Sequence, residues 1–143
     1  MNCAVIVTKD IIPVLEKMGQ EGNGKRAAGA GQSRHGDVKY PFLEGITDCT
    51  MTVPLSIGEA HSIRFGDFNK GLALLEKAMS GCNKMIIYLE HIKGMYGEEV
   101  DAGILDEIIA RYAESRTKTF HLEQSWKKWH TAPRDVSPGK IKL

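Results

Sequence analysis

The sequence predicts an α+β fold, in which a small antiparallel sheet from the N-terminal half packs against a long antiparallel helical hairpin from the C-terminal half. Apolar and polar residues alternate over 49–57, which is typical of a half-buried strand. From residue 68 onward the apolar residues recur at steps of three and four, which is typical of amphipathic helices. With 143 residues, of which 42% are hydrophobic and 26% charged, the chain should form a single domain over 1–143.

The N-terminal part is predicted to contain one strand, one helix and a long loop. Residues 3–8 are a short β-prone apolar run, and residues 9–18 place apolar side chains at helical spacing. Pro13 suits the first turn of that helix, where no backbone N–H is needed. Residues 19–37 are rich in glycine and almost free of apolar bulk, so we expect a flexible loop there.

Besides the strand over 3–8, three segments are predicted to form the sheet as an antiparallel meander. Alternation begins over 38–42, is longest over 49–57, and returns over 61–65 after a short turn. Pro54 falls on the polar side of the second segment and has no N–H for a strand ladder. This strand is therefore expected at a sheet edge or with a bulge.

The first long helix is predicted to begin after Asp67, whose side chain can cap the helix N-terminus. Two adjoining apolar seams continue for about thirty residues, or roughly 45 Å at 1.5 Å per residue, until the glycines at 94 and 97 end the helix. Gly81 lies within the second seam and predicts a close crossing with another helix.

The second long helix is predicted from a seam of apolar residues over 105–129. Ser115 and Thr119 make the middle of this seam polar, which leaves open one continuous helix or two helices with a break between these residues. Pro133 ends the helical pattern, and residues 134–143 are expected to form a tail. A short connection between two long amphipathic patterns predicts an antiparallel hairpin.

The cysteines and histidines predict no metal site and no cofactor. Cys3, Cys49 and Cys82 are far apart in the sequence, which favours neither a disulfide framework nor a Cys-x-x-Cys site. We expect reduced thiols, with Cys49 and Cys82 packed as small apolar groups. The five histidines have no compact ligand spacing. A catalytic triad assembled from distant positions stays open, because triads are defined by geometry.

The glycine-rich loop is the first candidate binding segment. Residues 19–25 satisfy the G-x-x-x-x-G-K pattern, but an arginine replaces the Ser or Thr that holds magnesium in a P-loop, and no buried strand precedes the glycines. Nucleotide hydrolysis is therefore disfavoured. Glycine N–H groups and nearby basic side chains still suit a phosphate or a nucleic-acid backbone, and a solvated connector is the alternative. The candidate residues are Lys25, Arg26, Arg34 and His35.

The second candidate lies at the C-terminal end of the second long helix, where aromatic and basic residues occur together. Such residues suit stacking on bases or docking against an acidic protein. Alternatively, the two tryptophans continue the apolar seam and pack inside the molecule. The candidate residues are Trp126, Lys127, Lys128, Trp129, His130 and Arg134.

The charge of the chain is near zero overall but is unevenly distributed. The formal net charge is +1, whereas residues 86–114 carry −5 and residues 115–143 carry +5. Acidic residues at the start of a helix and basic residues at its end complement the helix dipole, which accounts for part of this pattern. The overall charge argues against a protein that coats DNA, but the C-terminal region alone can meet an anionic surface.

These observations together predict a non-enzymatic macromolecular binding protein, an adaptor or inhibitor, that uses the basic C-terminal surface and the glycine-rich loop. The expected partner is a protein or nucleic acid with an acidic surface. Such a role would suit a protein from a mobile genetic element. The alternatives are an enzyme that handles phosphate or nucleotides, a nucleic-acid-binding protein and a structural homo-oligomer. No signal peptide or membrane span is recognised, so we expect a soluble cytoplasmic protein.

Overall fold

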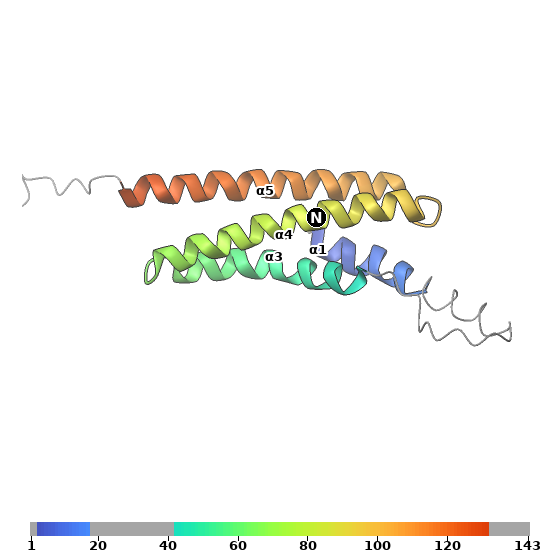
Figure 1. Ribbon diagram of the computed structural model, residues 1–143, viewed down its shortest axis with the longest axis horizontal. Coiled ribbons are helices and arrows are strands. Elements are labelled where there is room, and N and C mark those ends of the chain that lie inside the picture. Colours follow the sequence, from blue (N-terminus) through green and yellow to red (C-terminus); the bar gives the residue numbers. More distant parts are fainter. Residues whose placement is uncertain (1–2, 18–41, 132–143) are drawn as a thin grey trace, which may run out of the picture.

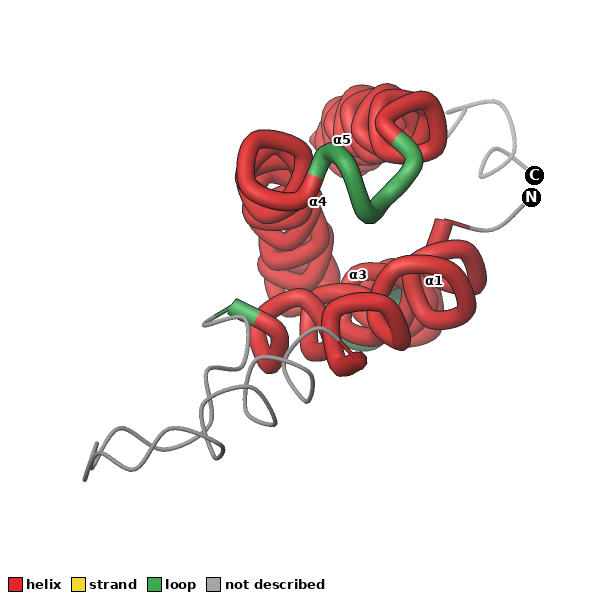
Figure 2. Tube along the Cα trace, turned by 90° about the vertical axis from the view of Figure 1, so that its right-hand side faces the viewer, coloured by secondary structure: helices red, strands yellow, loops and turns green. Residues whose placement is uncertain are grey.

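The computed structural model describes residues 3–17 and 42–131, and every regular element within them is helical. Three long helices lie along the long axis of the molecule, and the short N-terminal helical segment lies beside the start of the first of them (Figures 1 and 2). The elements are α1 (Cys3–Ile6), the π-helical turn η1 (Val7–Ile11), a helical stretch over 12–17, α3 (Leu43–Ile63), α4 (Phe68–Tyr96) and α5 (Ala102–Thr131).

The predicted α+β class is therefore wrong, because the described residues contain no strand. The segment predicted as the longest strand, 49–57, lies inside α3, and residues 61–63 form its last turn. Residues 64–65 belong to the turn that leads to α4. The predicted strand over 38–42 lies outside the described residues except for Phe42, which precedes the first residue of α3.

Two competing periods in the same segment explain this error. Ile46, Val53 and Ala60 are seven residues apart and all buried, which is the pattern of a helix face. Met51 and Leu55, which completed the alternating pattern, are exposed. Pro54 lies on the solvent side of α3, so the helix tolerates it without a clash against the core.

The N-terminal strand predicted over 3–8 is also helical. Ile6, Val7, Ile11 and Leu15 are all buried, so the apolar side chains point to one side of a continuous helical segment. The wider π-helical turn of η1 lies between the first and last of these residues and adjusts their register. Apolar β-branched runs of this length fit a buried helix as well as a strand.

The antiparallel hairpin of α4 and α5 is present as predicted (Figure 1). Asp67 caps α4 by accepting a hydrogen bond from the backbone N–H of Lys70 at 3.0 Å. Gly97 follows the last residue of α4. The predicted second helix is one continuous α-helix of 30 residues, within which the hydroxyl of Thr119 donates a hydrogen bond to the carbonyl of Ser115 at 2.7 Å. None of the described helices is long and apolar enough to cross a membrane.

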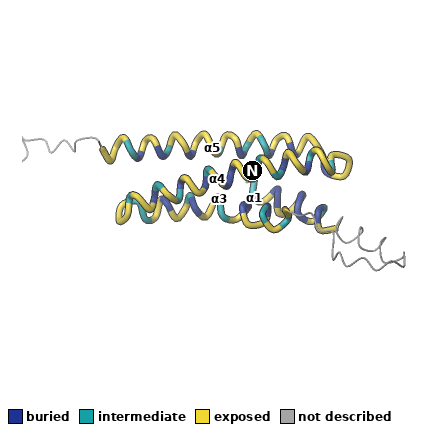
Figure 3. Tube along the Cα trace, viewed as in Figure 1, coloured by how far each residue is buried: buried dark blue, intermediate teal, exposed yellow. Residues whose placement is uncertain are grey.

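The buried residues lie on the inner faces of these helices (Figure 3). They form a core with two parts. The larger part, the main core, includes Ile11, Ile46, Met85, Leu89, Ile108 and Tyr112, and so joins every element. The smaller part, the terminal core, is formed by Ala60, Leu75 and Trp126. Along α3 and α5, the buried polar residues Ser56, Thr119 and Glu123 fall between the two parts.

Candidate binding surface

The structure describes half of the residues predicted to bind a partner. Lys25, Arg26, Arg34, His35 and Arg134 lie outside the described residues. The other predicted residues, Trp126, Lys127, Lys128, Trp129 and His130, lie in the last two turns of α5. These turns lie next to the α3–α4 turn at the left of Figure 1. The candidate surface is therefore built by the end of α5 together with residues far away in the sequence.

The two tryptophans have opposite environments. Trp126 is only 6% exposed and belongs to the terminal core, whereas Trp129, one turn later, is 76% exposed. The expectation that both rings continue the buried seam is therefore confirmed for Trp126 and wrong for Trp129. Trp129 lies in the last turn of α5, where it faces solvent although the next residue, His130, still packs against α4. A tryptophan left this exposed is unusual, since its large apolar ring gains most from burial.

The two lysines also differ. Lys127 Nζ lies 2.6 Å from Oε1 of Glu123, whose side chain is almost completely buried. This hydrogen bond with Glu123 raises the pKa of the Lys127 ammonium. Lys128 is exposed and forms no ion pair with the described residues. The charge of Lys127 is thus partly neutralised within the chain, and Lys128 is the cation that faces solvent.

Arg64, at the end of α3, connects this part of α5 to the α3–α4 turn. The centre of its guanidinium lies 4.7 Å from the centroid of the Trp126 ring and 4.4 Å from that of Phe65. Phe65 is 86% exposed, so one of these rings is buried and the other faces solvent. Arg64 forms no ion pair within the described residues, and its buried Nε has no hydrogen-bond partner there. The guanidinium therefore lies between two aromatic rings, with no carboxylate of the described residues beside it.

His130 completes the surface on the side of α4. Its ring stacks on that of Phe68, with centroids 3.8 Å apart and an angle of 8° between the planes. On the other side, His61 meets the edge of the Trp126 ring at 5.2 Å. These contacts fix the end of α5 against the ends of α3 and α4.

We name Arg64, Phe65, Lys128, Trp129 and His130 the aromatic end. It combines two highly exposed aromatic rings with two cations that no described carboxylate neutralises. Exposed aromatic rings are typical anchors of protein interfaces, and nearby cations add attraction to an acidic partner. The arrangement can bind, but it contains no paired nucleophile and base with which to catalyse a reaction.

Sequence reasoning missed Arg64 and Phe65. The alternating pattern predicts a strand over 61–65, and a strand gives no indication that Phe65 is exposed at a helix end. The available signal was the Arg-Phe-Gly-Asp run over 64–67, because glycine followed by a helix-capping aspartate marks a turn between helices.

The three cysteines form the other group that the fold brings together. Cys3, Cys49 and Cys82 come from α1, α3 and α4 and all pack in or against the main core, where Tyr112 also lies. Cys49 and Cys82 are buried, as predicted. Burial raises the pKa of each of the three thiols, that of Cys82 to about 11, so they are poor nucleophiles. Among the described residues, no group of His, Cys, Asp or Glu is arranged to hold a metal ion.

Comparison of the chain with protein-family models, curated proteins and solved structures gives no match.

Proposed function

We propose that this chain is a non-enzymatic binding protein that docks the aromatic end onto an acidic surface of a protein partner. The observation that carries the proposal is the exposure of Trp129 and Phe65 beside the unneutralised cations of Lys128 and Arg64. A ring of this size left in water has a large apolar area available for burial.

Two further features support the proposal, a rigid docking site and the net charge of the chain. Trp126 of α5 contacts Arg64 and His61 at the end of α3, and His130 stacks on Phe68 of α4, so the neighbouring exposed groups start from a fixed scaffold. Preorganised side chains lose little conformational entropy on binding. The near-neutral charge of the whole chain favours a protein partner over a nucleic acid, because nucleic-acid affinity depends mostly on many phosphate contacts.

The proposal can be tested by capture from a cell lysate with two pairs of variants on α5. Trp129→Ala and Lys128→Glu change the aromatic end, whereas Phe120→Ala and Arg116→Glu remove an exposed ring and reverse an exposed positive charge, with no ion pair to a described residue, nearer the middle of the helix. We expect the first pair to lose a specific set of captured proteins and the second pair to retain it. Identical capture by Trp129→Ala and the unmodified chain would contradict the proposal.

The kind of partner can be tested with defined probes. The chain has two tryptophans, so the variant Trp126→Phe leaves Trp129 as the only indole fluorophore. We expect poly-glutamate to change its fluorescence at low salt, and the change to weaken as salt screens the charges. A single-stranded oligonucleotide that binds much more tightly than poly-glutamate would instead favour the alternative of nucleic-acid binding, in which bases stack on the exposed rings.

A further inference from the structure

The half of α4 that leads to the α4–α5 turn exposes a second apolar surface. Ile87 is 66% exposed and Met95 is 54% exposed, and His91 lies between them at helical spacing. Phe42 extends this surface from the start of α3, because its half-exposed ring stacks on Tyr88 at 5.6 Å and meets the edge of His91 at 5.5 Å. Large apolar groups gathered on one helix face mark a site of interaction.

Exposed carboxylates outnumber the cations beside this surface, where Lys84 lies one turn before Ile87. Glu90, Glu98 and Glu99 are exposed and form no ion pair with any described residue. Two other acidic residues nearby, Asp106 and Glu107, are paired with Lys93 and Arg111. The unpaired carboxylates therefore give this end of the molecule an excess of negative charge. We name Ile87, Glu90, His91, Met95 and Glu98 the acidic face. Its chemistry is the complement of the aromatic end, with apolar groups on both surfaces and opposite charges around them.

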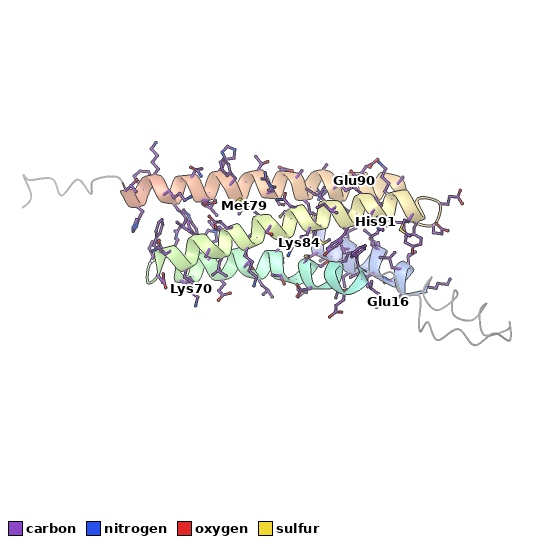
Figure 4. All side chains as sticks on the ribbon, in the orientation of Figure 1. Glu16, Lys70, Met79, Lys84, Glu90 and His91 are labelled. Carbon is purple, nitrogen blue, oxygen red and sulfur yellow. The ribbon has the colours of Figure 1, made fainter. Side chains whose placement is uncertain are left out.

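The two surfaces lie at opposite ends of the molecule. Glu90 and His91 are in the part of α4 near the α4–α5 turn, whereas Lys70 marks the end of α4 beside the aromatic end (Figure 4). Helix α4 has 29 residues, and α5 has 30 and runs antiparallel to it. One copy of the chain therefore cannot bring its own aromatic end onto its own acidic face.

We infer that the acidic face binds the aromatic end of a second copy of this chain. The inference rests on the proposed function, since it names a partner for the same docking surface. The two surfaces differ, so the contact is heterologous. A copy that has bound through its aromatic end still has a free acidic face, to which a third copy can bind. Such contacts build open chains or closed rings rather than a symmetric dimer.

Analytical ultracentrifugation of complementary variants tests this contact. Ile87→Arg disables the acidic face and retains the aromatic end; the double variant Trp129→Ala, Lys128→Glu does the reverse. We expect the unmodified chain to associate at high concentration and low salt. The dissociation constant for self-association should rise at least about tenfold in each variant alone, since central anchors dominate such interfaces. An equimolar mixture of the variants should form a one-to-one dimer and nothing larger, because only one heterologous contact remains.

The matched control is Leu55→Arg, which places the same charge at an equally exposed apolar position on α3 and should leave association unchanged. A monomeric unmodified chain, or a mixture of variants that stays monomeric, would overturn the inference. The lysate-capture experiment tests the proposed function separately from self-association. Ile87→Arg should still capture the acidic partner protein, whereas Trp129→Ala should not. Circular dichroism of each variant confirms that the helices are intact.

Discussion

Gly81 and Gly58 are two helical glycines with opposite surroundings. A Cβ added at Gly81 would lie 2.6 Å from Cγ2 of Val53, so α3 and α4 cross closely at this point, as the sequence predicts. A Cβ added at Gly58 would meet nothing within 4 Å. The first glycine is required by packing, and the second only weakens its helix.

The two positions should therefore respond to alanine in opposite directions. Gly81→Ala should lower the free energy of unfolding by about 1–3 kcal/mol, because the overpacked helices must separate. Gly58→Ala should raise it by about 0.5–1 kcal/mol through helix propensity alone. Urea denaturation followed by circular dichroism measures both. A stabilising Gly81→Ala would show that the helices do not meet at this crossing.

The buried thiols predict a loss of stability at alkaline pH. Burial raises the pKa of Cys82 from 9.0 to about 11, and it also raises those of Cys3 and Cys49. The unfolded chain releases these protons at lower pH than the folded chain does, so the unfolded state binds fewer protons in between. Stability is therefore fully present below about pH 9 and is lost as the pH rises toward 11. Cys82 alone should account for about 2–3 kcal/mol of this loss.

Thermal unfolding at a series of pH values checks this expectation. The midpoint should stay level up to about pH 8 and then fall, and Cys82→Ala should reduce the fall. An equal fall in that variant would assign the alkaline transition to other groups, such as Tyr112, whose pKa is also raised by burial.

At the scale of elements, the helical hairpin could be predicted from the sequence and the N-terminal half could not. In α4 the buried residues Leu75, Cys82 and Leu89 repeat every seven positions over many turns, which only a helix explains. In α3 the alternation over 49–57 competes with the helical spacing, and sequence alone does not reveal that Met51 and Leu55 face solvent. Whether the segment forms a strand or a helix is decided by the residues that pack against each of its faces. Those residues are distant in sequence.

Pro54 is the residue that most opposed a helical reading of α3. It has no N–H to donate to the carbonyl of Thr50, so the helix lacks one internal hydrogen bond at this point. Pro54→Ala should restore that bond and raise the midpoint of thermal unfolding, with a gain of about 1–3 kcal/mol. An unchanged or lower midpoint would mean that the packing of α3 against α4 depends on a bend at the proline.

At the scale of the whole molecule, the candidate site was predictable in part. Trp129 and Lys128 could be selected from sequence, because aromatic and basic residues cluster near the end of an amphipathic pattern. Arg64 and Phe65 were missed although the predicted hairpin brings the start of α4 to the end of α5, because a strand was predicted over 61–65 and the exposure of Phe65 depends on the helix end that replaces it. The burial of Glu123, which neutralises Lys127, likewise depends on the packed structure.

The division of the core by Ser56, Thr119 and Glu123 has a consequence for how the molecule opens. The terminal core has one buried residue from α5, Trp126, with the partly buried Leu122 packed against it, whereas the main core contains the buried α5 residues Leu105, Ile108 and Tyr112. The last turns of α5 can therefore detach while the rest stays folded, as a local unfolding unit of lower stability. Amide hydrogens near Trp126 should then exchange with solvent earlier than those near Tyr112, through a minor open state, whereas in the closed state the ring contacts hold the aromatic end in place.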